Sequence, residues 1–488
     1  MPSKTSQFDK ALDEVLKDLK PRQKECGNCK ENFQIYEEDI DFYQMLRVPP
    51  PKLCPLCRKK RRFGHLMRVP KFFKKPCSAP GHTEEVITVF PPASPHKIYD
   101  FSYYHSDSWD AAEFGRQYNE AKQFFEQFKQ LFFEVPHIAL ERDPYGVNCD
   151  YTLGGKGGKN NYYCAMGYQS QDCMYCLDGR FSNNLVDCSV IYKSELCYGS
   201  VSSTSCSRCI MAVGCSQCLD SAFIYECKNC SHCFMSSNLR NKSYVFENEQ
   251  LTKEEYEKRI KLINLGDRKI FNEYSRKFVE MHGKAFHRAA QTVHCKNSIG
   301  DNLTEGDNCY FAFRGGKAEN IRYLDNFENV KDSMDGTNML GERIFESVLA
   351  LGSKIHFSMY ARNCTFMEYS SECLNCNYCF GCVGLKNKKF HIFNKPYSEN
   401  EYYVKIDLIK TEMLKNGEYG EFFSLSLGLM PYQSSSGQYF FPLSEEEAQK
   451  QSIPWYDEPE SRIPENMRLR YAPADVPQNI KEVSDDIL

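Results

Sequence analysis

Long hydrophobic runs are missing from this 488-residue chain, and we expect no secretion leader in its first residues. No stretch of about 18 apolar residues occurs, which argues against a membrane-spanning helix. Residues 1–20 lack the apolar core of a signal peptide. There, Phe8, Leu12 and Leu16 have helical spacing, and we expect a short amphipathic helix capped by Ser6. We therefore expect a cytoplasmic protein with no membrane partner.

Catalytic signatures are scarce as well. The glycine-rich stretch 154–158 contains a lysine but lacks the Lys-Ser/Thr ending of a phosphate-binding loop, and neither a Ser-His-Asp order nor paired carboxylates stand out. The sequence thus favours a binding or scaffolding role over an enzymatic one. Cysteine, by contrast, is abundant. The 25 cysteines are odd in number, which disfavours complete disulfide pairing and favours reduced thiols acting as metal ligands or small core residues.

Two Cys-x-x-Cys motifs stand near the start of the chain, Cys26 with Cys29 and Cys54 with Cys57. Each motif places two thiolates on one side of a tight turn, and two such turns close a tetrahedron around zinc. So short a segment has little core in which four cysteines could simply pack. We predict one structural zinc ion here. An all-thiolate site leaves no position for water or substrate, so the ion is not expected to be catalytic.

Acidic residues are absent from residues 42–75, although the whole chain has 65 Asp and Glu against 61 Lys and Arg. The predicted nucleic-acid-binding residues of this run are Arg58, Lys59, Lys60, Arg61, Arg62, Arg68, Lys71, Lys74 and Lys75. A few charges would offset four thiolates, so a run of this length favours contact with a polyanion, and we predict RNA or a ribonucleoprotein. The interleaved rings could stack on bases, or could form the small core of the ribbon; they are those of Phe63, His65, Phe72 and Phe73.

Residues 295–406 repeat the pattern of residues 149–260 at an offset of 146 residues, which is 379 minus 233. The cysteines that coincide under this shift are Cys149 with Cys295, Cys218 with Cys364, Cys227 with Cys373, Cys230 with Cys376 and Cys233 with Cys379. Each copy then ends in a capping box, Thr252 to Glu255 and Ser398 to Glu401, so we expect a closing helix in both. Within the copies many cysteines recur every nine residues, a short period typical of stacked β-solenoid coils with small residues inside.

Two alternative interpretations assign metals to the repeats. In one, zinc is held by Cys206, Cys209, Cys215 and Cys218; in the other, an iron–sulfur cluster is held by Cys373, Cys376, Cys379 and Cys382. The second copy has Gly352, Ile355 and Ala361 at the first three zinc positions, replacements that a core accepts and a ligand set does not. The cluster motif also lacks the proline that follows its last cysteine, where this chain has Val383. We therefore expect the repeat cysteines to fill a core.

A second metal position is conceivable after the first. Cys77 and His82 could be ligands, joined by His96 or His105, but the paired-cysteine geometry is missing. We therefore interpret residues 71–107 as a degenerate ribbon that folds as a hairpin without an ion.

Two further segments have simple interpretations. The dense aromatic face from Phe124 to Phe133, stopped by Pro136, predicts a helix whose rings dock the head onto the repeats. The Pro-rich end, residues 421–488, is expected to be extended and anchored by Trp455 and Tyr456.

The sequence resembles the uncharacterised zinc-ribbon-headed, cysteine-repeat proteins of reduced-genome bacteria of the candidate phyla. The matching segments are Phe42-Tyr43, 48–51 (Val-Pro-Pro-Pro), Cys54 to Arg58, Arg61-Arg62, Ser106 to Asp110, Gly115-Arg116, Cys379 to Lys388 and Tyr439 to Leu443. That family has no established activity, so the resemblance implies an architecture and not a reaction.

The expected fold is α+β and β-rich: an N-terminal zinc ribbon followed by an internally duplicated, cysteine-rich, β-solenoid-like body with a helix closing each copy. The expected segments are a helix (1–20), a zinc ribbon (21–70), a hairpin (71–107), a helical connector (108–140), copy one (141–290), copy two (291–420) and a tail (421–488). For function we predict a non-enzymatic zinc protein that binds RNA or a ribonucleoprotein. The alternatives are a protein–protein interaction scaffold and an iron–sulfur or thiol redox protein.

Overall fold

The computed structural model describes residues 4–67, 71–149 and 151–456. The fold is mixed α/β and rich in strands, with two large, mostly parallel sheets and a group of four cysteines near the N-terminus. The described residues form two compact units. Residues 4–140 together with 288–456 make the first unit, and residues 141–287 make the second. Within the described ranges, no helix is both long enough and apolar enough to cross a bilayer.

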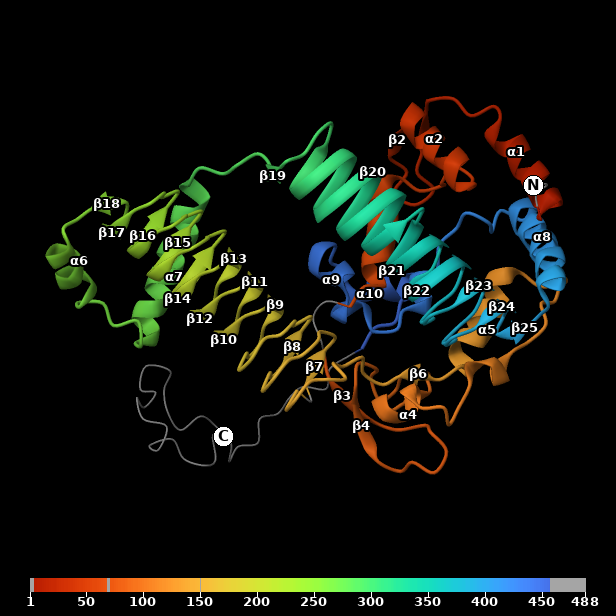
Figure 1. Cartoon of the computed structure of the whole chain (residues 1–488), viewed down its shortest axis with the longest axis horizontal. Helices are drawn as coiled ribbons and strands as arrows, with labels where there is room; N and C mark the ends of the chain where they lie inside the picture. Colours follow the sequence, from red (N-terminus) through yellow and green to blue (C-terminus); the bar gives the residue numbers. More distant parts are fainter. Residues whose placement is uncertain (1–3, 68–70, 150, 457–488) are drawn as a thin grey trace. The chain divides into compact units, whose positions relative to one another are not determined.

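The second unit is one large sheet followed by two helices (Figure 1). Its elements are β7 (Thr152–Leu153), β8 (Cys164–Ala165), β9 (Leu177–Arg180), β10 (Asn183–Val186), β11 (Ser189–Tyr192), β12 (Glu195–Tyr198), β13 (Val201–Thr204), β14 (Ser207–Val213), β15 (Leu219–Tyr225), β16 (Ser231–Ser237), β17 (Ser243–Phe246), β18 (Glu249–Gln250), α6 (Lys253–Ile260) and α7 (Arg268–Lys284).

The first unit contains the head, which we define as residues 22–64, and the segments that follow it. Its N-terminal elements are α1 (Ser6–Leu16), β1 (Arg22–Glu25), β2 (Asn32–Ile35), α2 (Glu37–Leu46), α3 (Pro55–Gly64), β3 (Phe73–Pro76), β4 (Glu85–Thr88), β5 (Ile98–Tyr99), α4 (Phe101–His105), η1 (Ala111–Phe114), α5 (Phe124–Glu134) and β6 (His137–Ile138). The head is therefore more helical than stranded, because its second Cys-x-x-Cys motif opens helix α3 and not a second hairpin.

The same unit contains the second large sheet, which we call the first-unit ladder, β19 to β25. The C-terminal elements are β19 (Thr292–Val293), β20 (Ile299–Glu342), β21 (Phe345–His356), β22 (Met359–Glu368), β23 (Asn377–Phe380), β24 (Lys389–Ile392), β25 (Lys395–Pro396), α8 (Glu399–Lys415), η2 (Leu425–Leu427), η3 (Tyr432–Ser434), α9 (Ser436–Phe440) and α10 (Glu445–Lys450).

Parallel pairing in the second-unit sheet follows a register of twelve residues, not the nine that the cysteines suggested. In the first-unit ladder the offset is eleven where β20 pairs with β21 and becomes twelve from Gly352 onward. Ser189 pairs with Val201, and Cys379 pairs with His391. The nine-residue spacing has a different origin, since many of the buried thiols donate to a carbonyl nine positions on. One example is the Cys188 Sγ, which lies 3.4 Å from the Cys197 carbonyl oxygen. The nine-residue cysteine spacing thus reflects a side-chain contact between neighbouring strands, and the twelve-residue offset reflects the backbone pairing.

Within each twelve-residue segment, every third residue has a left-handed backbone. In the second unit this holds for Asn184, Asp187 and Val190, with φ of 54°, 53° and 57°. Asn and Asp tolerate this conformation better than most residues, which accounts for their abundance in the repeats. The residue directly after each of these bends points inward and is buried, as Cys188 is after Asp187. Small thiols suit so narrow an interior.

Helices close the sheets where the capping boxes predicted them. Thr252 caps α6 and Ser398 caps α8. In both helices the carboxylate of the Glu three residues later accepts the backbone N–H of the cap residue. The α8 helix lies beside α1 (Figure 1), and the Asp407 carboxylate of α8 accepts the backbone N–H of Phe8 at 2.7 Å. The predicted cap at Ser6 is wrong, since α1 starts at Ser6 itself and Thr5 precedes it.

The aromatic helix predicted at 124–133 is α5, and its rings face the first-unit ladder. The Phe124 ring centroid lies 5.1 Å from that of Tyr369, and the Phe128 ring stacks on Phe423 at 4.6 Å. The expected extended tail is wrong for residues 425–440, which form short helices. A short helix predicted from the capping box of Ser444 and Glu447 is confirmed as α10. Trp455 does pack against that helical cluster. Residues 457–488 lie outside the described residues.

Buried neutral histidines make the first unit sensitive to acid. Burial lowers the pKa of His65 and of His356 to about 4 each, and that of His96 to about 2. Below pH 6.5 the unfolded chain binds protons that the folded unit does not, so stability falls as pH falls. Each such histidine is expected to contribute a slope of about 1.4 kcal/mol per pH unit between pH 6 and 4.5.

The change His65→Gln tests this expectation. The amide of glutamine can still donate to the Phe423 carbonyl that His65 Nε2 contacts at 3.2 Å. Urea unfolding of the variant between pH 6 and 4.5 should show a slope about 1.4 kcal/mol per unit shallower than that of the natural chain, whatever its absolute stability. Equal slopes would show that His65 is not held neutral.

Candidate metal centre

The first cysteine pair sits on the turn of the β1–β2 hairpin. The Cys26 N–H donates to the Glu31 carbonyl at 2.9 Å and the Lys30 N–H returns to the Cys26 carbonyl at 3.1 Å, with Lys30 left-handed at φ 64°. The Gly27 N–H donates to the Lys52 carbonyl at 3.0 Å. This last bond holds the hairpin turn against the segment that leads into the second cysteine pair.

The second pair begins helix α3. Cys54 is the N-cap residue, and its Sγ accepts the backbone N–H of Cys57 at 3.4 Å. Pro55 at the first helical position fixes the backbone there. The Cys54 N–H in turn donates to the Cys26 Sγ at 3.3 Å. Backbone donors thus point at the sulfurs from both turns, as they do around bound thiolates.

The four sulfurs fit one metal ion. The Sγ atoms of Cys26, Cys29, Cys54 and Cys57 all lie within 4.8 Å of one another. The Cys29 and Cys54 sulfurs are 3.8 Å apart. A tetrahedron with metal–sulfur bonds of about 2.3 Å has sulfurs about 3.8 Å apart, so the arrangement needs little adjustment to hold an ion. Three of the four cysteines are buried, and Cys29 is exposed.

Burial and hydrogen bonding act in opposite directions on these thiols. Although burial would raise it, backbone N–H donors from Cys54 and Cys29 lower the pKa of Cys26 to about 6. Burial raises the pKa of Cys54 to about 12 and raises the pKa of Cys57 as well. A bound divalent cation favours the thiolate at each position and supplies the charge that the cluster lacks.

The arginines that follow Cys57 are buried against the first-unit ladder. Arg58 and Arg62 are each 1% exposed, and both reach the Asp335 carboxylate. Arg58 Nη2 lies 2.8 Å from Asp335 Oδ2, and Arg62 Nη1 lies 3.2 Å from Oδ1. Although burial opposes it, Asp335 raises the pKa of Arg58, while burial lowers the pKa of Arg62. These two side chains have no surface from which to contact a phosphate.

The neighbouring cations are also paired within the chain. Arg61 Nη2 lies 2.6 Å from Glu346 Oε1, and its Nη1 lies 3.4 Å from Glu421 Oε2. Lys59 Nζ lies 2.6 Å from Asp325 Oδ2. The three guanidinium groups of α3 therefore face three carboxylates, those of Asp335, Glu346 and Glu421. Sequence analysis missed these partners because each lies hundreds of residues further along the chain.

The remaining predicted nucleic-acid residues vary in exposure. Lys60 and Lys74 are exposed, whereas Lys71 and Lys75 are partly buried. Lys75 Nζ donates to the carbonyls of Ser94 and His96 at 2.6 and 2.8 Å. Arg68 lies outside the described residues. RNA binding stays a prediction, and a phosphate contact would have to use the exposed lysines and not the arginines of α3.

The proposed ligands of the second metal position, Cys77 and His82, do come together, and Glu84 and Asp100 join them. His96 and His105 are not part of this group. The two ligand sets considered for the repeats do not form, since no three body thiols within the described residues come within 4.8 Å of one another. Among those residues the 25 cysteines are all free of disulfide bonds.

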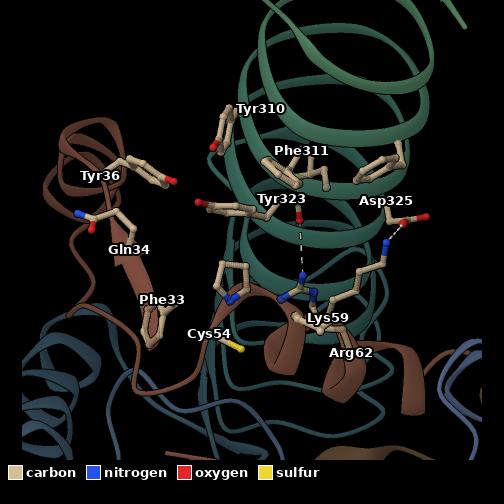
Figure 2. A pocket seen from close by; sticks show the side chains of 14 residues that line it. Phe33, Gln34, Tyr36, Cys54, Lys59, Arg62, Tyr310, Phe311, Tyr323 and Asp325 are labelled. Carbon is tan, nitrogen blue, oxygen red and sulfur yellow. Dashed lines mark hydrogen bonds and ion pairs between the residues drawn. The ribbon is translucent and has the colours of Figure 1, made fainter. Parts of the chain in front are cut away.

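An aromatic-lined cavity of about 430 Å³ lies beside the cysteine centre, between the head and β20 (Figure 2). The head contributes Phe33 and Tyr36, and β20 contributes Tyr310, Phe311 and Tyr323. These rings contact one another, with 6.0 Å between the Tyr36 and Tyr310 centroids and 5.8 Å between those of Tyr310 and Tyr323. The charged lining residues are already paired, as the contact between Lys59 and Asp325 in Figure 2 shows.

The opening of this cavity is apolar and accessible. Leu56 of the head is 52% exposed and Phe311 is 46% exposed. Sequence analysis did not find the cavity, because its two sets of rings come from distant segments and neither has a motif of its own.

Comparisons with known proteins give no family and no relative. No family model matches the chain, and no curated protein matches it either. Among solved structures, the crystal structure of a "putative acetyltransferase" from Desulfovibrio desulfuricans G20 is similar at 10% sequence identity, covering 52% of this chain and 67% of that chain with a TM-score of 0.11. A likeness of that size carries no argument about fold or function.

Proposed function

We propose that this chain is a non-enzymatic zinc protein that acts as a protein interaction scaffold. The observation that carries the proposal is the aromatic cavity, which the head and β20 form jointly. Six of its fourteen lining residues are aromatic, and the charges around it are compensated within the chain. A concave apolar site with few free polar groups suits an apolar side chain of a protein partner better than a phosphate.

The metal is proposed to be zinc because four thiolates in two turn motifs form the set typical of structural zinc. The ion would fix the hairpin of β1 and β2 to the start of α3, and so hold Phe33 and Leu56 at the cavity. Four protein ligands leave no position for a substrate, so the ion's role is to hold the head in shape.

The two sheets are proposed to be duplicated β-solenoids whose coils are eleven or twelve residues long. Support comes from the parallel register, which is twelve in the second unit and eleven or twelve in the first, and from inward residues at every third position. The 146-residue repeat of the sequence fits the same interpretation. Free thiols suit a reducing cytoplasm, which we propose as the location. The resemblance to the zinc-ribbon-headed, cysteine-repeat family stays a prediction.

A photo-crosslinking amino acid placed at Leu56, at the mouth of the cavity, tests the scaffold. The matched control is the same group at Leu262 of the second unit, which is 82% exposed. In nuclease-treated cells we expect a discrete protein adduct from position 56 only. The additional change Phe311→Ala should reduce its yield about tenfold, since a buried aromatic contact is worth about 1–2 kcal/mol. Phe366→Ala, which removes a 39%-exposed ring elsewhere in the same unit, should not.

Equal labelling from positions 56 and 262, or an adduct insensitive to Phe311→Ala, would contradict the scaffold. A crosslink to RNA at position 56 would instead favour the second candidate, an RNA-binding role. The observation that supports that candidate is the set of adjacent rings, Tyr310, Phe311 and Tyr323, which could stack on bases.

A further inference from the structure

The hairpin of β3 and β4 brings two potential metal ligands together beside its turn. Cys77 follows β3 and Glu84 precedes β4, and the Cys77 N–H donates to the Glu84 carbonyl at 3.1 Å. The turn between them is closed by the His82 N–H, which donates to the Ala79 carbonyl at 3.1 Å. The Cys77 side chain is buried, being 6% exposed, and Glu84 faces solvent.

A third segment adds a carboxylate from the opposite side. Asp100 lies between β5 and α4, and its backbone N–H donates to the Cys77 Sγ at 3.3 Å. The segment is tied to the hairpin because the Ser78 N–H donates to the Ile98 carbonyl at 2.7 Å. His82 Nδ1 then lies 2.5 Å from Glu84 Oε1 and 3.6 Å from Asp100 Oδ2. All four ligand atoms are within 4.8 Å of one another.

The two oxygens of Asp100 have different surroundings. Oδ1 caps helix α4, accepting the N–H groups of Ser102 and Tyr103 at 2.8 and 3.2 Å. Oδ2 is buried and has no hydrogen-bond partner among the described residues. A buried carboxylate oxygen without a donor is costly unless a cation balances it. Within those residues neither Asp100 nor Glu84 is paired with a lysine or an arginine, and His82 is the one basic group that either contacts.

We propose that Cys77 Sγ, His82 Nδ1, Glu84 Oε1 and Asp100 Oδ2 bind a second divalent zinc ion. Thiolate, imidazole and carboxylate are all ordinary zinc ligands, and four of them complete a tetrahedron. On binding, the thiol of Cys77 releases its proton and His82 coordinates through a neutral Nδ1, so that the ion replaces the hydrogen bond between His82 and Glu84. The ion also supplies the partner that Asp100 Oδ2 lacks.

This ligand set differs from the four thiolates of the head in ways that can be measured. It has one sulfur, and one of its ligands, Glu84, is exposed. We therefore expect it to hold zinc less tightly than the first centre and to lose it first to a chelator. With cobalt in place of zinc, one thiolate should give about a quarter of the sulfur-to-metal charge-transfer absorption of a four-thiolate centre.

The decisive measurement is the zinc content of the full chain, purified without oxygen and dialysed against low micromolar zinc. We expect two zinc ions per natural chain and one per Asp100→Asn chain. Asparagine is as good an N-cap as aspartate, so α4 keeps its cap while the anionic ligand is lost. The matched control is Asp267→Asn, because Asp267 caps α7 in the same way through the Lys269 N–H and lies in the other unit. That variant should keep two ions.

A second variant, Cys77→Ser, guards against misfolding of the first. It should remove the weaker cobalt absorption and leave that of the four-thiolate centre intact. The proposal is overturned if the natural chain binds one ion under these conditions, or if both Asp100→Asn and Cys77→Ser still bind two.

Discussion

Replacing Asp335 with asparagine is expected to destabilise the first unit by about 3–5 kcal/mol, because it leaves two buried guanidinium groups without a counter-charge. Arg58 and Arg62 both pair with this carboxylate, and all three side chains are buried. The effect should be seen as a lower urea midpoint for that unit. Its unfolding can be followed by fluorescence, since both tryptophans of the chain, Trp109 and Trp455, lie within it.

The matched control changes a carboxylate of the same strand that is paired at the surface. Glu319 on β20 lies 2.9 Å from Lys331, with both side chains at least half exposed. Glu319→Gln is therefore expected to cost no more than about 1 kcal/mol. If Asp335→Asn and Glu319→Gln lower the free energy of unfolding equally, the buried ion pairs of Asp335 with Arg58 and Arg62 do not stabilise the first unit. Replacing Asp335, Arg58 and Arg62 together by Leu, Met and Met should recover most of the lost stability, because the unpaired charges are then gone.

Removing the metal from the head is expected to have the other large effect. Structural zinc contributes about 10–16 kcal/mol to the folding of isolated zinc-finger peptides, so its loss should unfold residues 22–64 at ambient temperature. Loss of the metal should also weaken the contact between the head and β20, since α3 begins at Cys54 and carries the arginines that pair with Asp335. We expect Cys57→Ser to lower the zinc content by one ion per chain and to expose the head to limited proteolysis.

A matched serine substitution in the repeats distinguishes a ligand from a core thiol. Cys227 is buried within the second-unit sheet. Cys227→Ser should leave the zinc content unchanged and affect the stability of the second unit alone. A loss of zinc on changing Cys227, or no loss on changing Cys57, would reverse the roles assigned to the two classes of cysteine.

The grouping of the four cysteines could be predicted from the sequence, because its information is local. Each Cys-x-x-Cys motif specifies its own turn, and pairing two of them leaves few alternatives for a short segment. The capping boxes at Thr252 and Ser398 were predictable for the same reason. Their signals lie within four residues of one another.

The role of the basic run could not be predicted, because its partners come from another part of the chain. An acid-free segment predicts an external anion only when no internal carboxylate is available. Asp335 and Glu346 supply such carboxylates from within the ladder, where nothing in the neighbouring sequence marks them as partners. Asp100 was missed similarly, since it reaches Cys77 only once β5 has been placed beside the hairpin.

The twelve-residue register has a consequence for how such a chain can change in length. Inserting or deleting twelve residues within the second-unit sheet would keep every inward position inward and every hydrogen-bonded pair in step, so that the sheet gains or loses one layer. An insertion of a single residue would move all later thiols off the interior column. Growth in whole layers therefore offers such a chain a direct way to alter its span while leaving the packing of each layer intact.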